Sequence, residues 1–487
     1  MQQAFQKMVS SREVKLILVV SLLILVNILS HHYRTTWDRT VNKDFTLNSA
    51  TQSYLQSTTI TERKAPIKIF AILRSSNTTL GTHLQRTLDL VLEANDTAFE
   101  IAIIDATRQP AEAALLASKY EVNLSREVVI IDAQTPDKQG SPFIRIVDTE
   151  EMLIWGKDSH GVNRVRAIQD ENILLTHLIK AIEGEARNAY YLTDGFKFSD
   201  LAEESVLTTL KPIFNQYNID VKPLSLNSSN AIPEDAKALF LLAPYTFSKE
   251  HVALLEKYAD RNHSAIWISF DADQQPQQLR NFLRNYGIHP FRDIVVSKQL
   301  GKIKSASNVL IQSHSGFLKG LEGNYTTLRG RSSSFELDSD SQEWVARQIY
   351  KEPLLISDED SWSENHPEEE PITFNPNHDS KGPLTLGVAV QQGDDQLLNQ
   401  SRRMIVLGNN EFLLRKNITK EQIDFTSNLV NWLVARDDLI GIQPKDLSLY
   451  RISMTEDQKR QVQNLALVAI PTIGFLCAFL IWLNRKN

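Results

Sequence analysis

The sequence has a single cysteine, Cys477, among its 487 residues. One cysteine cannot form an internal disulfide, a redox-active cysteine pair or a thiolate zinc site. Basic residues are also in short supply, because 52 Lys and Arg stand against 59 Asp and Glu and leave a net charge of −7. Nucleic-acid binding needs a basic surface for phosphate contacts, so this composition argues against it.

Several catalytic motifs are missing as well. Residues 312–316 (QSHSG) lack the first glycine of the Gly-x-Ser-x-Gly elbow of serine hydrolases. The chain has neither a P-loop for nucleotide phosphates nor the HExxH motif of zinc proteases. The adjacent His31 and His32 are only a weak signal for a metal. We therefore expect no catalytic residue, no cofactor and no metal.

The overall composition is that of a globular protein. Hydrophobic residues make up 42% and charged residues 23%, with 18 Gly and 17 Pro. These values exclude a collagen-like, mainly disordered or mostly transmembrane protein. At roughly 150 residues per domain, the length predicts about three domains.

The two longest apolar runs lie at the ends of the chain. Residues 14–30 form an apolar run that we interpret as an uncleaved anchor rather than a cleaved signal peptide, because no small-residue cleavage site follows it. Residues 465–483 have no charge and are about as long as a bilayer requires. Lys and Arg flank the outer side of both runs, so both termini are predicted to be cytoplasmic. The region between them is then periplasmic or otherwise extracytoplasmic, and the protein belongs to the inner (cytoplasmic) membrane.

The region between the two runs alternates between strand and helix patterns. The predicted strands span residues 67–73, 99–105, 128–131, 143–147, 189–193, 221–224, 238–243, 265–270 and 404–407. The predicted helices span residues 81–95, 110–120, 170–185, 201–217, 248–261, 276–286 and 419–434. This alternation predicts an α/β architecture.

The alternation divides into two units. Residues 66–185 have the order βαβαββα, which fits a thioredoxin-like layout, but no cysteine follows the first strand, so disulfide exchange is excluded. Residues 188–300, rejoined by 404–407, predict a doubly wound sheet of amidotransferase-like type. Such domains use a cysteine nucleophile, which is absent here because Cys477 lies in the last apolar run. Residues 300–400 form a polar stretch that we expect to be irregular.

The predicted organisation follows from these patterns. In chain order it consists of a cytoplasmic tail (1–13), a transmembrane anchor (14–30), a juxtamembrane segment (31–65), a thioredoxin-like domain without cysteines (66–185), an amidotransferase-like domain (186–437), a connector (438–463), a transmembrane helix (464–483) and a cytoplasmic tail (484–487).

Residues 357–370 (SDEDSWSENHPEEE) hold seven acidic residues and no Lys or Arg. A calcium site is conceivable, but the spacing and central glycine of an EF-hand loop are absent. We interpret this segment as a solvated acidic loop.

Polar residues follow the carboxyl ends of the predicted strands in the second unit. In open α/β sheets, ligands bind at this edge. Polar residues there are also ordinary turn formers, so a ligand cleft is only one interpretation. The candidate cleft residues are Asp194, Tyr245, Asp271, Asp273, Asn409 and Glu411.

Three stretches together resemble the auxiliary component of gliding-motility-type ABC transport systems. They are the anchor with residues 41–47 (VNKDFTL), residues 232–258, and the segments 408–412 (GNNEF), 428–433 (NLVNWL) and 440–445 (IGIQPK) before the last apolar run. The second stretch is similar to the family's amidotransferase-like domain, which is shared with an intraflagellar transport subunit. The sequence departs from the family where Phe45 replaces Leu, and where residues 193–196 (TDGF) replace a Gly-His-Gly-Glu turn.

The resemblance implies a non-catalytic, membrane-anchored subunit that partners a membrane permease and a separate ATPase. Its exported domain would bind substrate or an envelope partner. Two alternatives stay open: an envelope hydrolase or transferase that uses the cleft carboxylates, and a membrane-anchored glycoprotein scaffold. The second is suggested by eight Asn-x-Ser/Thr sequons, which include Asn77, Asn95, Asn227 and Asn417.

Overall fold

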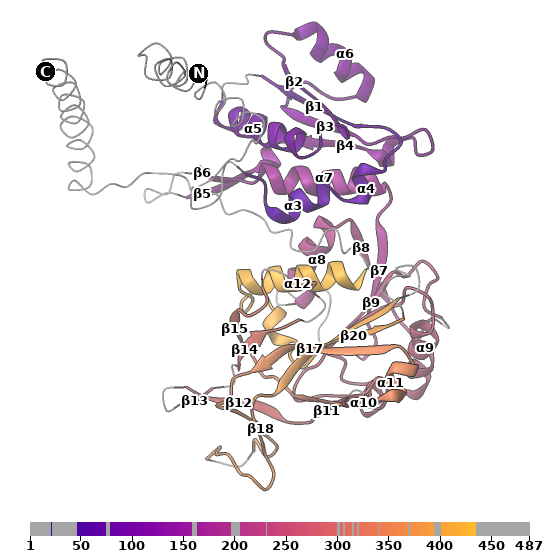
Figure 1. The fold of residues 1–487 in the computed structure, drawn as a ribbon, viewed down its shortest axis with the longest axis vertical. Coiled ribbons are helices and arrows are strands. Elements are labelled where there is room, and N and C mark those ends of the chain that lie inside the picture. Colours follow the sequence, from indigo (N-terminus) through magenta and orange to yellow (C-terminus); the bar gives the residue numbers. More distant parts are fainter. Residues whose placement is uncertain are drawn as a thin grey trace, which may run out of the picture. The chain divides into compact units, whose positions relative to one another are not determined.

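The fold was analysed in a computed structural model (Figure 1). It describes residue 21 and residues 46–434, apart from 75–77, 158–162, 196–204, 230, 300–301, 305–306, 314–315, 319–320, 340, 369–370 and 394–400. The predicted spans over 14–30 and 464–483 thus lie outside the described residues, except for residue 21. Among the described residues, no helix is both long and apolar enough to cross a membrane.

The first α/β unit follows two short helices, α3 (Ser49–Leu55) and α4 (Thr58–Thr61). Its elements are β1 (Ile67–Leu73), α5 (Thr79–Ala94), β2 (Phe99–Asp105), α6 (Pro110–Tyr120), β3 (Val128–Asp132), η1 (Ser141–Phe143), β4 (Ile144–Asp148), η2 (Thr149–Met152) and α7 (Asp170–Glu183). The sheet order is β2-β1-β3-β4, with β1 parallel to β2 and antiparallel to β3. The predicted βαβαββα order is confirmed for these elements, but two further strands lie between β4 and α7 in the chain. All five residues of β3 are buried, as expected for a strand covered on both faces.

The sequence patterns missed one hairpin between β4 and α7. It consists of β5 (Leu153–Lys157) and β6 (Asn163–Ile168), which pair with each other in a two-stranded sheet of their own. The hairpin belongs to a separate compact unit of the chain. Ile154 and Trp155 are exposed on it.

The second unit is built on an eleven-stranded sheet of described residues. Its parallel part has the order β8-β7-β9-β10-β21, with β7 (Arg187–Leu192), β8 (Ile219–Leu224), β9 (Ala238–Leu242), β10 (Ala265–Ser269) and β21 (Arg402–Leu407). The helices of this part are α8 (Val206–Gln216), α9 (Lys249–Ala259), α10 (Gln277–Arg284) and α12 (Lys420–Leu433). The predicted return of residues 404–407 to the sheet is confirmed, because Met404 to Leu407 pair in parallel with β10.

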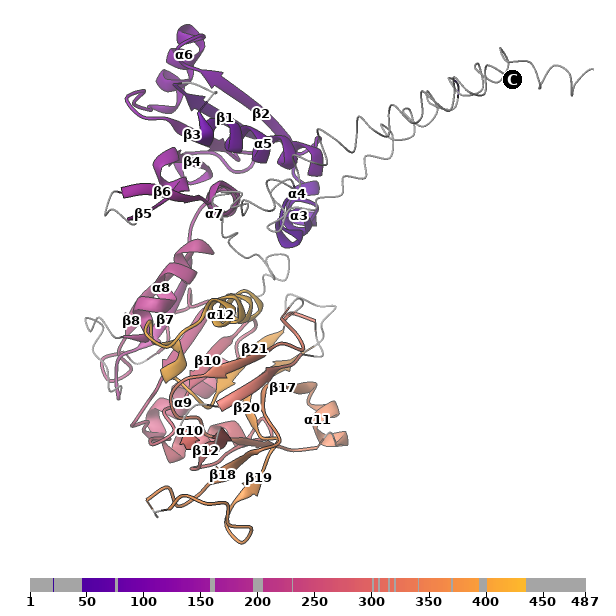
Figure 2. The ribbon, with the colours of Figure 1, turned by 90° about the vertical axis from the view of Figure 1, so that its left-hand side faces the viewer.

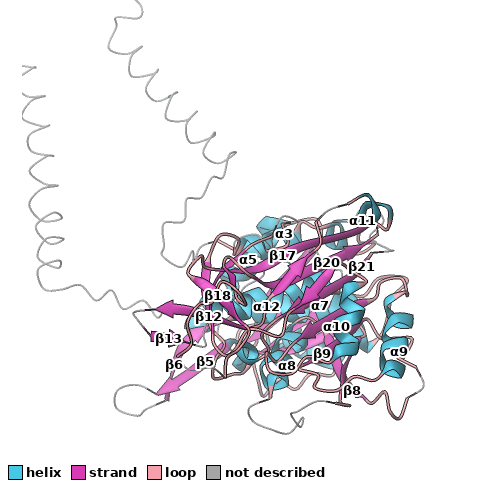
Figure 3. Ribbon diagram, turned by 90° about the horizontal axis from the view of Figure 1, so that it is seen from below, coloured by secondary structure: helices cyan, strands magenta, loops and turns pink. Residues whose placement is uncertain are grey.

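The parallel strands are covered on both faces, because successive side chains of a strand point to opposite sides. Phe240, Trp267 and Ile405 lie in one apolar core with residues of α8 and α12. Leu241, Ile266 and Val406 lie in a second core with residues of α9 and α10. Figures 1 and 2 show these two pairs of helices on opposite sides of the sheet, and Figure 3 colours the helices and strands separately. The sheet is therefore doubly wound, as predicted.

The prediction that residues 300–400 are irregular is wrong for the described residues. This region holds much of the antiparallel part of the sheet, including β14 (Ser307–Ile311), β15 (Tyr325–Leu328), β16 (Phe335–Leu337), β17 (Ile349–Ser357) and β20 (Thr385–Gln392). A second sheet has the order β13-β12-β18-β19, with β12 (Ile294–Gln299), β13 (Lys302–Lys304), β18 (Ser361–Glu364) and β19 (Ser380–Lys381). The remaining elements of the unit are β11 (Ile288–Pro290), α11 (Gln342–Ala346) and η3 (Glu411–Leu413). β20 lies between β17 and β21. Its five central residues are buried there, and its polar ends are half-buried.

The interpretation of residues 357–370 as a solvated acidic loop is wrong in its centre. Residues Ser361–Glu364 form strand β18, and all four of them are buried. The Glu364 carboxylate accepts a hydrogen bond from the backbone N–H of His366 at 2.9 Å. A buried carboxylate needs such partners, so this part of the segment is structural.

Candidate functional site

The candidate cleft residues lie at one edge of the parallel sheet, where β7, β9, β10 and β21 end. The structure places them in two groups. Asp271, Asp273, Asn409 and Glu411 follow the neighbouring strands β10 and β21, and Asp194 and Tyr245 follow the neighbouring strands β7 and β9. The prediction from strand ends therefore gathers four of the six residues around one place.

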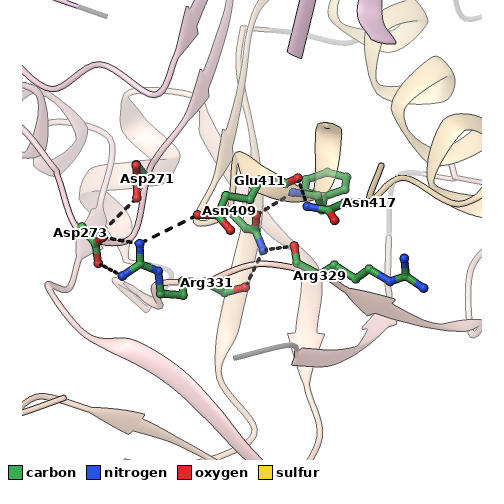
Figure 4. Close-up of polar contacts among 9 residues, drawn as sticks. Asp271, Asp273, Arg329, Arg331, Asn409, Glu411 and Asn417 are labelled. Atoms are coloured by element: carbon green, nitrogen blue, oxygen red, sulfur yellow. Dashed lines mark hydrogen bonds and ion pairs between the residues drawn. The ribbon is translucent and has the colours of Figure 1, made fainter. Parts of the chain in front are cut away.

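Arg331 is the centre of the first group (Figure 4). Its Nη1 donates a hydrogen bond to Asp273 Oδ1 at 2.7 Å, and its Nη2 pairs with Asp273 Oδ2. The same Nη2 lies 4.0 Å from Glu411 Oε1. The backbone N–H of Asp273 donates to Asp271 Oδ1 at 3.2 Å. We call Asp271, Asp273, Arg331 and Glu411 the Arg331 cluster.

The Arg331 cluster joins a two-pronged guanidinium–carboxylate pair to a second, more distant carboxylate. Two-pronged pairs of this kind fix the geometry of both partners. The side chains of Arg331, Asp273 and Glu411 are 39%, 36% and 35% exposed, so they remain accessible to a ligand from solvent. Asp271 is buried by comparison.

Asn409 has a different place from the one predicted, because it is buried and holds the site together. Its Nδ2 donates to the carbonyl of Arg329 at 3.3 Å and to Ser332 Oγ at 3.0 Å. Its Oδ1 accepts from the backbone N–H of Phe412 at 3.0 Å. Both ends of the amide are thus occupied by the protein. Asn409 is a positioning residue that ties the segment before Ser332 to the turn that carries Glu411.

Two glycines allow the segment that carries Arg331 to approach the strand end. A Cβ on Gly408 would lie 2.0 Å from the carbonyl oxygen of Ser333. Gly330 has a φ of +93°, and a Cβ there would lie 2.4 Å from Glu411 Cβ. Side chains at either position would push the Arg331 segment away from β21.

Two serines that follow Arg331 in the sequence anchor its segment to the loop after β10 and to Asp293. The hydroxyl of Ser333 accepts from Gln275 Nε2 at 2.7 Å, and the backbone N–H of Ser334 donates to Asp293 Oδ1 at 2.9 Å. Burial raises the pKa of Asp293 from its ordinary value, and the hydrogen bonds from Ser334 act in the opposite direction. The Arg331 segment is therefore held between the loop after β10 and Asp293.

Asp194 and Tyr245 lie where the strand order reverses, since β7 has β8 on one side and β9 on the other. Such a switch point is the usual ligand crevice of open α/β sheets. Asp194 accepts from Ser225 Oγ and from the backbone N–H of Asn227, both at 2.9 Å. Burial opposes ionisation of Asp194, but the hydrogen bonds from Asn227 and Ser225 outweigh it and lower the pKa of Asp194.

Tyr245 is 45% exposed, and its backbone N–H donates to the carbonyl of Gly195 at 2.8 Å. The two loops thus touch through the main chain. Ala243 lies between the end of β9 and Tyr245. It has a φ of +52°, a left-handed conformation that is unusual for a residue with a side chain. A methyl group occupies this sharp strand end, where hydrolases with an elbow place their nucleophile.

The sequence patterns did not single out Arg331, Gln275 or Asp293. Arg331 lies between β15 and β16 in a stretch without periodicity, and its partner Asp273 is 58 residues away. Among the described residues, no group of three or more His, Cys, Asp or Glu side chains could hold a metal ion.

The similarities to known proteins that were found are similarities of structure. No protein family model matches this sequence, and no curated protein does. The mmIFT52 N-terminal domain superposes with a TM-score of 0.37 and 12% identity, over 50% of this chain and 96% of its own. A putative ThuA-like protein from Bacteroides uniformis gives a TM-score of 0.30 with 11% identity, over 51% of this chain and 92% of its own. One from Parabacteroides merdae gives 0.31 with 10% identity, over 53% and 90%. At such TM-scores and identities, these likenesses assign no activity to this chain.

Proposed function

We propose that this chain is a non-catalytic auxiliary subunit of a bacterial ABC transport system. It is anchored in the inner membrane at both ends, and its thioredoxin-like and amidotransferase-like units lie outside the cytoplasm. The observation that carries the proposal is the order of the three stretches that resemble the family, which together cover nearly the whole chain. A permease and a separate ATPase are the partners that this resemblance implies.

The Arg331 cluster is the surface through which the exported domain binds substrate or an envelope partner. Its support is the pairing of Asp273 with Arg331 at 2.7 Å, with Glu411 4.0 Å beyond. A general acid or base needs a carboxyl group whose proton is free to move near neutral pH. Asp273 instead has both carboxylate oxygens engaged by the Arg331 guanidinium, which fixes the direction of these polar groups and suits recognition of a polar partner.

The proposal is tested by purifying the tagged full-length chain from membranes of its own organism. We expect a multi-span permease and an ATPase to be recovered together with it. The Arg331→Ala variant should keep both partners but lose the transport phenotype, because the cluster is assigned to substrate or an envelope partner.

The matched control is Arg347→Ala. Arg347 Nη1 lies 3.9 Å from Glu343 Oε1 on the surface of the same unit, and its side chain is 41% exposed, close to the value for Arg331. It should behave as the parent chain. Recovery of neither transporter subunit would refute the proposal. Loss of function in Asp271→Asn and Glu411→Gln, with a measurable hydrolytic activity in the parent, would favour the enzymatic alternative.

A further inference from the structure

A polar cavity lies between β16 and the β18–β19 sheet, and none of the four residues of the Arg331 cluster lines it. Its volume is ≈ 760 Å³, within the range of small-molecule sites. It is lined by Phe291, Ser334, Phe335, Glu336, Leu337, Ser363, Asn365, His366, His378, Ser380, Pro383, Leu384 and Thr385. We call it the β16–β18 pocket; β18 is labelled in Figures 1 and 2.

The polar lining offers unused hydrogen-bonding groups. Among the described residues, the side chains of Glu336, Ser380 and Thr385 and the imidazole nitrogens of His378 form no hydrogen bond. A hydroxyl both donates and accepts, a neutral imidazole does the same through its two nitrogens, and a carboxylate accepts. A ligand with several hydroxyl groups meets all of these requirements at once.

The apolar lining supplies flat surfaces. Phe291 is 40% exposed, so part of its ring can be reached from solvent. Phe335, which also lines the pocket, is buried, and its ring centroid lies 6.3 Å from that of Phe270. The ring of Phe291 is therefore available to cover an apolar face of a ligand, while Phe335 fixes the wall.

The charge of the lining selects against anionic ligands. Among the described residues that line the pocket there is no Lys or Arg, and Glu336 is the one acidic residue. Phosphates and carboxylates are normally recognised by Arg, by Lys or by a helix N-terminus. The pocket therefore fits a neutral ligand better than a nucleotide or an acidic peptide.

A buried carboxylate, that of Asp379, holds the segment that carries the lining residues Asn365, His378 and Ser380. Asp379 is 9% exposed, and its two oxygens accept from the backbone N–H groups of Asn375 at 2.7 Å and Asn365 at 3.3 Å. The rings of His366 and His378 meet edge to face, with centroids 5.3 Å apart. A pocket that is already ordered loses less entropy when a ligand binds.

We propose that the β16–β18 pocket binds a neutral oligosaccharide. Sugar rings combine apolar C–H faces with a dense set of hydroxyls, which matches one exposed aromatic ring beside free hydroxyl, imidazole and carboxylate groups. This proposal does not rest on the proposed transport function, and the pocket shares with the Arg331 segment only Ser334, whose backbone N–H is bound to Asp293.

The test uses the full-length protein in nanodiscs, so that no sugar-headed detergent competes. An array of neutral and anionic glycans is screened first, and titration calorimetry follows with maltotriose, cellotriose and triacetylchitotriose at millimolar concentrations. We expect neutral glycans to bind in preference to anionic ones. Phe291→Ala should weaken binding about tenfold, because it removes the apolar face of the ligand from contact.

The control variant is Phe374→Ala. Phe374 is 42% exposed, close to the value for Phe291, and lies in the segment between β18 and β19 without lining the pocket. Its binding should equal that of the parent chain, and circular dichroism should show both variants folded. His378→Ala is a second variant that is expected to weaken binding, since it removes a hydrogen-bonding ring at an exposed position. The proposal is overturned if no neutral glycan binds, if only anionic glycans bind, or if Phe291→Ala binds as tightly as Phe374→Ala.

Discussion

Gly408 is the position where a single methyl group should do the most damage to the Arg331 cluster. Its backbone N–H donates to the carbonyl of Leu386 at 2.8 Å, and its carbonyl accepts from the N–H of Ser333 at 2.8 Å. A Cβ on Gly408 would lie 2.0 Å from the Ser333 oxygen and 3.0 Å from its carbonyl carbon. Both are backbone atoms, which cannot rotate aside as a side chain would. In Gly408→Ala the Ser333 segment must therefore move.

The size of the effect follows from two costs. Forcing an extra methyl group into a packed site costs about 1–3 kcal/mol. Breaking or stretching the hydrogen bond between Ser333 and Gly408 adds roughly 1 kcal/mol. The sum, about 2–4 kcal/mol, corresponds to a fall in Tm of roughly 5–15 °C for a domain of this size.

Gly323→Ala is the matched control. Gly323 has a φ of +82°, but nothing lies within 4 Å of a Cβ placed there. Alanine would then meet only the left-handed backbone penalty of about 1–2 kcal/mol. Thermal unfolding of the full-length variants, followed by intrinsic fluorescence, should show the larger loss in Gly408→Ala. An equal or smaller loss than in Gly323→Ala would show that the Ser333 contact is not tight in solution.

Four further predictions concern topology, the lone thiol, a buried carboxylate and the last span. Reporters fused before residue 14 and after residue 483 should both report cytoplasm, and one inserted near Asn365 should report the far side; an exported C-terminus would contradict the assignment of both spans. Cys477→Ser should leave function intact, because an apolar span has no charged neighbour to stabilise a thiolate; a severe loss at unchanged protein level would reveal a role for the thiol. The lowered pKa of Asp194 means that its charged form stabilises the fold above the ordinary aspartate pKa of about 4, and that this stability is lost as the pH falls through the lower, folded-state value. Urea unfolding should therefore show Asp194→Asn less stable than the parent at pH 7 and equal to it in strong acid, and a difference that persists unchanged in acid would assign the loss to packing. Gly474→Leu should insert in the membrane but co-purify less permease, because small residues let transmembrane helices approach closely; unchanged co-purification at matched expression would place Gly474 against lipid.

The elements with continuous apolar runs were predicted best. Strands β9, β10 and β21 are almost wholly buried, so each carries a run of apolar residues that stands out from its surroundings. Even the return of residues 404–407 to the sheet, more than 130 residues after β10, could be anticipated from such a run. The start of one helix was also predicted closely: the helix expected from residue 248 begins at Lys249, and Ser248 is its N-cap, because its hydroxyl accepts from the backbone N–H of His251 at 3.1 Å.

The antiparallel part of the second unit could not be read from the sequence in the same way. β17 contains Lys351, Glu352 and Pro353 between its apolar residues, which resembles a polar linker. The strand exists because β14 and β20 pair with it on either side, far away in the chain. In β18, Ser361 and Ser363 are buried through such pairing, although the surrounding composition is acidic. Burial in these strands comes from partners in the sheet rather than from their own hydrophobicity.

The candidate site likewise combines residues that the sequence predicts with one that it does not. The pairing of β10 with β21 brings Asp271, Asp273, Asn409 and Glu411 to one place, and the apolar runs predicted that both strands belong to the same sheet. Arg331 is absent from the prediction because its position depends on contacts of Ser333 with Gln275 and of Ser334 with Asp293, which no local pattern encodes. Without Arg331, the strand ends look like a group of carboxylates suited to acid–base chemistry. With it, two of those carboxylates share one guanidinium. Arg331, which the sequence did not reveal, engages both carboxylate oxygens of Asp273, so the structure adds a geometric reason for the binding role that the sequence already favoured over catalysis.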